Sequence, residues 1–238
     1  MKKTILLLLL AVFTISVNAQ TQVVTGVNIG IALEYDGSHL YIAENFGNKI
    51  SRIDLNVGAS SYEVVTNISR PEGVAIYGNN VYTAGIQLGG ATAADISGSL
   101  PATSNNIAAG NNIRTVVFDA THGLYLIKTD GSSNTKIYNI SGTTQTFIVD
   151  VGVGDVRAAT IEGSEMYLSS RNDGAIYKFD LNNVTTPTLV KSGLNQPYEI
   201  DIANNNLYFA SEAGILGKFD LANTAATPTI FVNNTLGD

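Results

Sequence analysis

Residues 39–55 read HLYIAENFGNKISRIDL, two short apolar runs separated by the polar turn ENFGN. Runs of this length, rich in β-branched and aromatic residues and bounded by Gly and Asn, predict two strands joined as a hairpin. The first run recurs four more times, and a tyrosine marks each copy. These tyrosines are Tyr41, Tyr82, Tyr125, Tyr167 and Tyr208, at spacings of 41, 43, 42 and 41 residues. The hairpin is therefore one unit of an internal repeat.

Each repeat contains two further runs with strand character. The second run of the hairpin recurs as TAADISG, TKIYNISG, AIYKFDL and ILGKFDL. One more run precedes each tyrosine (IGIAL, GVAIY, TVVFD, AATIE, EIDIA), and a fourth follows (EVVTN, NNIAA, TFIVD, PTLVK, PTIFV). Four strands in about 42 residues predict the blade of an all-β propeller. A solenoid is the alternative, but four antiparallel strands per unit fit one poorly.

Three segments resemble known repeats: RPEGVAIYGNNVYTAG (70–85), NQPYEIDIANNNLYFAS (195–211) and LYIAENFGNKISRIDL (40–55). They are similar to NHL-repeat and YVTN-type propellers, and also to gluconolactonase-like and streptogramin-lyase-like propellers. The resemblance extends over essentially the whole mature chain. It implies the fold more than the activity, because these repeats host many functions.

The first nineteen residues predict a signal peptide. Lys2 and Lys3 precede an apolar run from Ile5 to Val17, and small residues lead to a cleavage site after Ala19. A membrane span needs about 20 apolar residues, so this run is too short to anchor the mature chain. The pattern is bacterial in character. We expect a secreted or periplasmic protein with a β-propeller domain at residues 20–238 and no membrane span after cleavage.

The two ends of the repeat region suggest a truncated ring. QVVTG (22–26) matches EVVTN (63–67) at the 41-residue spacing, so it has the place of an outermost, closing strand. We interpret the chain as five complete blades plus the closing strand of a further one, within a propeller of six or more blades. A complete five-bladed ring with a spare strand is the alternative.

Composition excludes several classes of partner. The formal charge is −7, and it becomes −9 when the two leader lysines are removed. An acidic surface disfavours nucleic acid, because neutralising phosphates requires a basic one. The absence of cysteine excludes disulfides and thiolate metal sites.

Residues that recur in every repeat are expected to be structural. An Asp or Asn ends each third strand: Asp54, Asp95, Asn139, Asp180 and Asp220. Side chains of this type bond to nearby backbone N–H groups and fix turns. These residues therefore predict turns and not an acidic site.

Residues that differ between repeats are the candidates for binding. Antiparallel order places the loops between second and third strands on the same face as those between fourth and first strands, at the mouth of the central channel. Four of the five arginines fall there: Arg70, Arg114, Arg157 and Arg171. Their guanidinium groups can hold a carboxylate or phosphate bidentately. The candidate ligand-binding residues are Glu44, Asn45, Glu72, Arg114, Arg157, Arg171, Asp173, Tyr198 and Glu212. The alternative is that the arginines bridge to Glu44, Glu72, Asp155, Asp173 and Glu212.

A divalent metal is a second reading of the same face. The gluconolactonase-like resemblance implies a Ca²⁺-type site with oxygen ligands, for which Glu72, Asp155, Asn195 and Glu199 are candidates. EYDGSHLY (34–41) matches only the turn part of that family's pattern, which argues against lactonase activity. His39 and His122 begin second strands on the opposite face, where neither can serve as a base at the mouth.

The sequence therefore predicts a non-enzymatic ligand- or protein-binding module that acts through its channel-mouth face. A glycan, a peptide or a small anionic ligand is the expected partner. The alternative is a metal-dependent hydrolase or lyase built on the same propeller.

Overall fold

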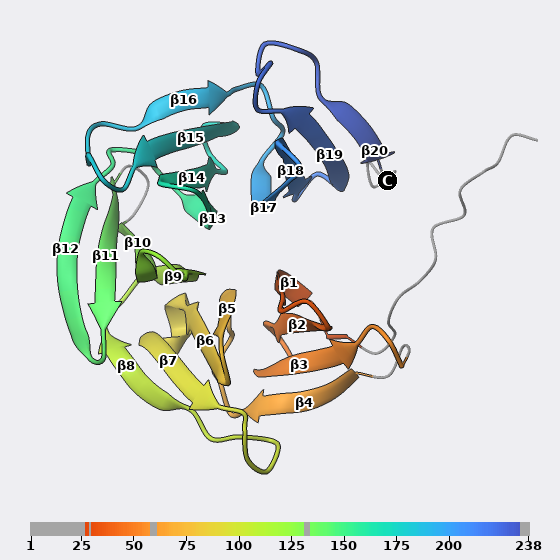
Figure 1. Ribbon diagram of the computed structural model, residues 1–238, viewed down its shortest axis with the longest axis vertical. Helices are drawn as coiled ribbons and strands as arrows, with labels where there is room; N and C mark the ends of the chain where they lie inside the picture. Colours follow the sequence, from red (N-terminus) through yellow and green to blue (C-terminus); the bar gives the residue numbers. More distant parts are fainter. Residues whose placement is uncertain (1–26, 29, 58–60, 131–133, 234–238) are drawn as a thin grey trace, which may run out of the picture.

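The computed structural model describes residues 27–28, 30–57, 61–130 and 134–233. Twenty strands in these ranges form five four-stranded antiparallel sheets, and each sheet uses four strands that are consecutive in the chain (Figure 1). The described residues thus form an all-β propeller with five blades, as the repeat predicts. Helical structure in the described ranges is limited to one short 3₁₀ turn, η1 (Ile86–Leu88).

The strands follow the sequence repeat closely, within three residues at each end. The first blade holds β1 (Gly30–Tyr35), β2 (His39–Glu44), β3 (Lys49–Asp54) and β4 (Ser61–Thr66). The second holds β5 (Gly73–Tyr77), β6 (Asn80–Gly85), β7 (Gly90–Asp95) and β8 (Asn105–Ala109). The third holds β9 (Ile113–Asp119), β10 (Gly123–Asp130), β11 (Asn134–Ser141) and β12 (Thr144–Asp150). The fourth holds β13 (Val156–Glu162), β14 (Glu165–Ser170), β15 (Ala175–Asp180) and β16 (Thr188–Lys191). The fifth holds β17 (Pro197–Ala203), β18 (Asn206–Ser211), β19 (Ile215–Asp220) and β20 (Thr229–Asn233).

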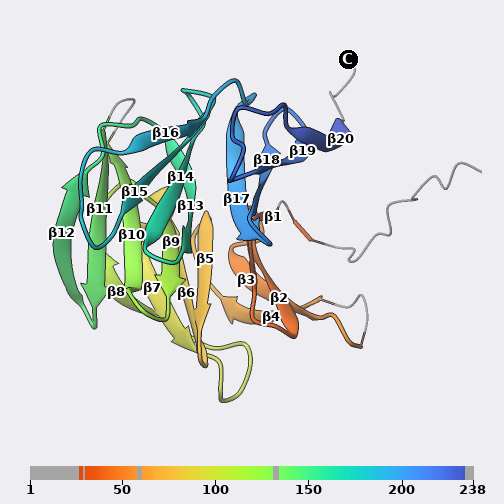
Figure 2. The ribbon, with the colours of Figure 1, turned by 45° about the horizontal axis from the view of Figure 1, so that its top comes forward.

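The first strand of every blade lies at the centre of the ring, and the fourth lies at the rim (Figures 1 and 2). Two sets of loops meet on one face. Backbone N–H groups of Arg171 and Glu212, in loops between second and third strands, donate to Asp155 and Gln196 in loops between fourth and first strands, both at 3.2 Å. This face is the channel mouth that strand order predicts.

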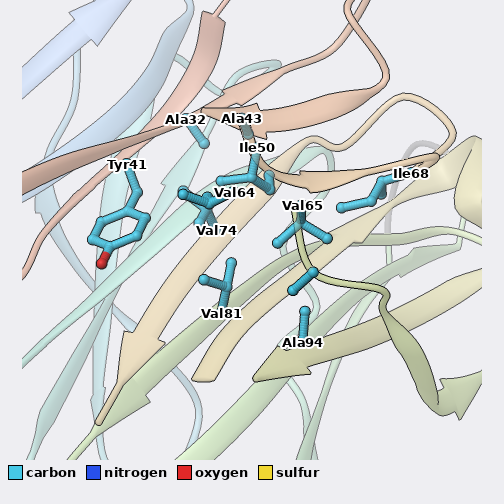
Figure 3. Close-up of a cluster of buried hydrophobic side chains, with 11 residues drawn as sticks. Ala32, Tyr41, Ala43, Ile50, Val64, Val65, Ile68, Val74, Val81 and Ala94 are labelled. Carbon is cyan, nitrogen blue, oxygen red and sulfur yellow. The ribbon is translucent and has the colours of Figure 1, made fainter. Parts of the chain in front are cut away.

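The hydrophobic core lies between adjacent blades. In Figure 3, Tyr41, Ala43 and Ile50 of the first blade pack with Val74 and Val81 of the second. The tyrosine face of each of the first four blades is directed at the following blade, since the other three core clusters repeat the arrangement. Burying each large aliphatic side chain contributes about 1.5–3 kcal/mol. The recurring apolar positions are therefore scaffold.

The recurring aspartates make the turns that the sequence predicts. Oδ1 of each of the four aspartates accepts the backbone N–H two residues later at 2.8 Å; the residues are Asp54, Asp95, Asp180 and Asp220. Asn139 occupies the equivalent position in the third blade, but its side chain donates hydrogen bonds and does not accept one from the turn. Its Nδ2 donates to the carbonyls of His122 and Leu124 at 3.2 and 3.3 Å.

The predicted signal peptide, the closing strand at residues 22–26 and the final residues 234–238 lie outside the described residues. In the portion of the chain that the structure describes, no helix has the length and apolar character needed to cross a membrane.

Candidate functional site

Four charged or aromatic side chains lie around the channel mouth, each at the start of the innermost strand of its blade. Arg114, Arg157 and Tyr198 are the second residues of β9, β13 and β17, and Glu72 directly precedes β5. Their spacing in the repeat predicts this shared position, because each occupies the same place in its own blade.

Arginines and carboxylates alternate along this rim and form one network. Arg114 Nη1 lies 2.9 Å from Glu72 Oε2, and its Nη2 lies 3.7 Å from Asp155 Oδ1. Arg157 Nε lies 2.9 Å from the same Asp155 oxygen. Arg171 Nη1 approaches Asp155 Oδ2 at 3.5 Å, and its Nε donates to Glu212 Oε2 at 2.6 Å. The six residues, which we name the charged belt, are Glu72, Arg114, Asp155, Arg157, Arg171 and Glu212.

Asp155 is the centre of the charged belt. Three guanidinium groups converge on its carboxylate, and only 9% of its side chain is exposed. The donors around it remain partly unused, since Nε of Arg114 is buried and makes no hydrogen bond. Charge-assisted bonds to guanidinium are strong, so the belt is both rigid and rich in donors.

Tyr198 forms a wall beside the belt. The Arg157 guanidinium carbon lies 5.3 Å from its ring centroid, which is a cation–π arrangement. Burial raises the pKa of the Tyr198 hydroxyl, against the opposite influence of the Arg157 charge. The backbone here is held by Ser169 Oγ, which donates to the Tyr198 carbonyl at 2.7 Å. The side chain therefore keeps its neutral hydroxyl at the mouth.

Three predicted site residues lie apart from the charged belt. Glu44 is fully buried and accepts the Asn28 backbone N–H at 2.7 Å and the Ser51 hydroxyl. Asn45 Nδ2 donates to the Pro71 carbonyl at 3.2 Å and so links two blades.

Asp173 accepts the Tyr177 hydroxyl at 3.2 Å. Arg70, the fourth arginine of this face, stacks on Phe46 with 4.6 Å between guanidinium and ring centroid. Salt bridges from arginines, the alternative to ligand binding that the sequence left open, are thus formed by Glu72, Asp155 and Glu212. The contacts of Glu44 and Asp173 given above involve no arginine.

A second group of carboxylates lines the channel itself. A cavity of about 530 Å³ extends along the innermost strands, and Glu34, Glu199 and Asp201 belong to its wall. Burial raises the pKa of Glu34 to about 7, and the charge of Asp201 adds to this effect. The pKa of Glu199 is raised by burial and then by Glu34 and Asp201. A carboxyl group that is buried near another carboxylate keeps its proton to a higher pH, because both burial and the neighbouring negative charge disfavour its ionised form.

Sequence reasoning selected Glu199 but missed Glu34 and Asp201. The register pairs Glu34 with Tyr41 and Asp201 with Tyr208, so both occupy one position of the repeat. The other blades hold Ala75, Val117 and Thr160 there. An ionisable residue at a position that is otherwise uncharged is the signal that could have found them.

His39 is the first residue of β2 and His122 directly precedes β10, so both lie at the end of the second strands that is opposite the mouth. His39 Nδ1 is 3.2 Å from Asp36 Oδ2, and His122 Nδ1 is 2.7 Å from Asp119 Oδ1. Among the residues that the structure describes, no three His, Cys, Asp or Glu side chains are grouped so as to hold a metal ion. Of the metal candidates, Glu72 and Asp155 are engaged by arginines.

Comparison with solved structures supports the fold. The chain is similar to a protein in the crystal structure of a nidogen/laminin complex, with a TM-score of 0.73 and 19% identity over 83% of this chain and 78% of that one. It is also similar to the computationally designed Ika8 protein, with a TM-score of 0.50 and 13% identity over 81% of this chain and 58% of that one. No protein-family model and no curated protein matches the sequence. Likeness at this level of identity establishes the propeller and leaves function to be argued from the site.

Proposed function

We propose that the protein is a non-enzymatic binding module whose channel-mouth face contacts a polypeptide partner through the charged belt and Tyr198. The N-terminal pattern supports a secreted or periplasmic location for this module. The similar solved structure is that of a nidogen/laminin complex, a complex between proteins. A protein-binding role for the present propeller is compatible with that example.

The observation that carries the proposal is the continuity of the charged belt. Ion pairs connect Glu72 of the second blade to Glu212 of the fifth through Arg114, Asp155 and Arg171. Alternating charge along one rim gives register and orientation to a partner that carries the complementary alternation. Arg and Tyr are also the side chains that most often dominate the energy of protein interfaces.

A peptide suits this rim better than a free anion does. Each belt arginine already has a carboxylate within 4 Å, so a small anion must displace an internal partner. A peptide that offers both a carboxylate and a basic group can exchange ion pairs with the belt without leaving a charge uncompensated. Leaving one charge of a buried pair alone costs about 3–5 kcal/mol, which favours such an exchange.

The test is a peptide array in which charge pattern is the only variable. The informative variant reverses one pair of the belt, Glu72→Arg together with Arg114→Glu. It keeps an ion pair between these two positions while inverting their charges, and Arg157 and Arg171 still compensate Asp155 when its contact with Arg114 is lost. We expect the preferred peptides of the wild-type protein to lose at least about tenfold in affinity, a ratio that corresponds to 1.4 kcal/mol.

The matched control is Arg52→Ala. Arg52 lies on a blade face, where its Nε donates to the Tyr62 hydroxyl at 2.6 Å, away from the belt. Melting curves of both variants establish that the fold is retained. Equal binding of the same peptides by the wild type and the reversed-pair variant contradicts the proposal.

A further inference from the structure

Arg70 differs from the other arginines of the chain, all five of which lie among the described residues. Arg114, Arg157 and Arg171 each have a carboxylate within 4 Å, and Arg52 donates to a tyrosine hydroxyl. Among the described residues, by contrast, no carboxylate lies within 4 Å of the Arg70 guanidinium, and the hydrogen bond that Arg70 donates comes from its backbone N–H. The N–H donors of this guanidinium are therefore open to a ligand.

Phe46 holds the Arg70 side chain in one place. The guanidinium carbon lies 4.6 Å from the centroid of the ring, and Phe46 is 52% exposed. Stacking uses one face of the planar guanidinium and leaves the donors at its edge free. The pair thus presents a charged fork beside an accessible apolar ring.

The two loops that carry this pair are bonded to each other. Asn48 Oδ1 accepts the backbone N–H of Arg70 at 3.0 Å, and the Asn48 carbonyl accepts that of Ile68 at 3.1 Å. Asn45 Nδ2 donates to the Pro71 carbonyl at 3.2 Å. Ile68 is 0% exposed and packs in the core shared by the first two blades (Figure 3). The two loops therefore form one fixed unit, so the fork is preorganised for a ligand.

The backbone of Arg70 belongs to the scaffold, whereas its side chain is specific to this blade junction. Arg70 has a φ of 46°, and the residues at the same place in the next three junctions, Asn112, Asp155 and Gln196, have φ values of 65°, 45° and 51°. The loops that correspond to residues 44–48 in the other blades contain no aromatic residue; they are residues 86–89, 130–134, 171–174 and 212–214. The stacked arginine and phenylalanine are thus a feature that only this junction combines, which is the pattern expected of a binding site in a repeat protein.

A carboxylate is the group that this fork fits. Its two oxygens accept two parallel N–H bonds from one edge of a guanidinium, and such charge-assisted pairs are strong. No internal ion pair has to be broken first, unlike at the charged belt. The net charge of −7 repels anions at a distance, so direct contact and not general attraction must hold the ligand. An apolar group next to the carboxylate would add contact by covering the exposed part of the Phe46 ring.

We propose that Arg70 and Phe46 form a carboxylate-binding subsite, which takes a carboxylate that has an apolar group beside it. Two sources have this chemistry: the C-terminal residue of a polypeptide with an apolar side chain, and a free apolar carboxylic acid. The subsite lies on the mouth face, but within the described residues it shares no ion pair with the charged belt. It goes beyond the proposed function and stands or falls separately, because its probes and variants are different.

The test is a titration of the ¹⁵N-labelled protein, followed by NMR, with probes that differ in one feature each. N-acetylleucine has the carboxylate and an apolar side chain, its amide lacks the charge, and N-acetylglycine lacks the side chain. We expect N-acetylleucine to bind at least about fivefold more tightly than either of these two, a ratio that about 1 kcal/mol produces. An acetylated tetrapeptide of glycine and alanine that ends in leucine distinguishes the sources. Tighter binding of the tetrapeptide than of N-acetylleucine supports a polypeptide end, and equal binding supports a free acid.

Two variants locate the binding. Arg70→Gln should lower the affinity for N-acetylleucine at least about fivefold, to the level of the amide. Phe46→Ala, at an exposed position, should still bind the carboxylate but lose the preference for leucine over glycine. Arg52→Gln is the matched control for charge, because its guanidinium also stacks on a ring, at 4.9 Å from the Tyr62 centroid, and its affinity should stay within about twofold of the wild type. Melting curves establish that each variant is folded.

Several results would overturn the proposal. Equal affinity for N-acetylleucine and its amide shows that no carboxylate is recognised. Equal losses in Arg70→Gln and Arg52→Gln show that only net charge matters. A leucine preference that survives in Phe46→Ala removes the ring from the site. Binding of none of the probes rejects the subsite altogether.

Discussion

Removing the Glu34 carboxylate should stabilise the protein, and the gain should depend on pH. Glu34 holds its proton more tightly in the folded protein, since its pKa is raised from 4.5 to about 7. The folded state therefore binds more protons than the unfolded state between these values. Stability conferred by this group is full below pH 4.5 and is lost as pH rises toward 7.

The size of the effect follows from the same shift. A rise from 4.5 to about 7 corresponds to an upper bound of ~3 kcal/mol. Glu34 is only partly buried, so solvent screening reduces this figure, and we expect about 1–2 kcal/mol. Glu34→Gln should nearly match the wild type at pH 5 and exceed it by that amount at pH 8, because the glutamine has no charge to be desolvated by burial or to repel Asp201.

Urea unfolding followed by circular dichroism at several pH values measures the difference directly. Comparing variant with wild type at each pH cancels the groups that both proteins share. Glu162→Gln is the matched control, since Glu162 is exposed at the end of β13, and it should change the free energy of unfolding by less than about 0.5 kcal/mol. A Glu34→Gln advantage that is the same at pH 5 and pH 8 would refute the reasoning.

Three further predictions concern the scaffold. Ile137→Ala should lower the free energy of unfolding by about 2–5 kcal/mol, whereas Leu216→Ala at the same repeat position should cost less than about 1 kcal/mol, because only Ile137 is buried; urea titrations with equal losses would contradict this. Asp36→Asn should cost about 1–2 kcal/mol at pH 7, a figure that is already reduced because Asp36 is exposed and solvent screens its charge. Burial alone would raise the pKa of Asp36, but hydrogen bonds from His39, Ser38 and Tyr41 lower it overall, so the loss should shrink in acid melts below pH 3.8. Gly73→Ala should cost about 1–3 kcal/mol in thermal melts, since its new Cβ would lie 2.7 Å from Thr115 Cα in the next blade; an unchanged melting temperature would show that the blades can separate at no cost.

The fold could be predicted because its signals are local. Tyrosine spacing, alternating apolar residues and turn aspartates each depend on a few neighbouring residues, and together they identify every described strand to within three residues. The general position of the mouth followed from strand order alone, since antiparallel strands must place alternate loops on one face.

The chemistry of the mouth could be predicted only in part. Repeat alignment brought Arg114 and Arg157 to one rim, but the convergence of three arginines on Asp155 depends on side-chain geometry across blades. Nothing in ENFGN reveals that Glu44 is fully buried beneath Asn28 and Ser51. Burial depends on the packing of the assembled ring, so it cannot be predicted from the sequence of one loop.

The blade order has a consequence for synthesis on the ribosome. Because each described sheet uses four consecutive strands, a blade can complete its own hydrogen bonds once its roughly 42 residues have emerged. Its tyrosine face, however, becomes covered only when the following blade arrives. At about 5–20 residues per second, this leaves each new apolar face open for roughly 2–8 s. The nascent propeller thus exposes a succession of apolar blade faces, and the speed of translation sets how long each one stays uncovered.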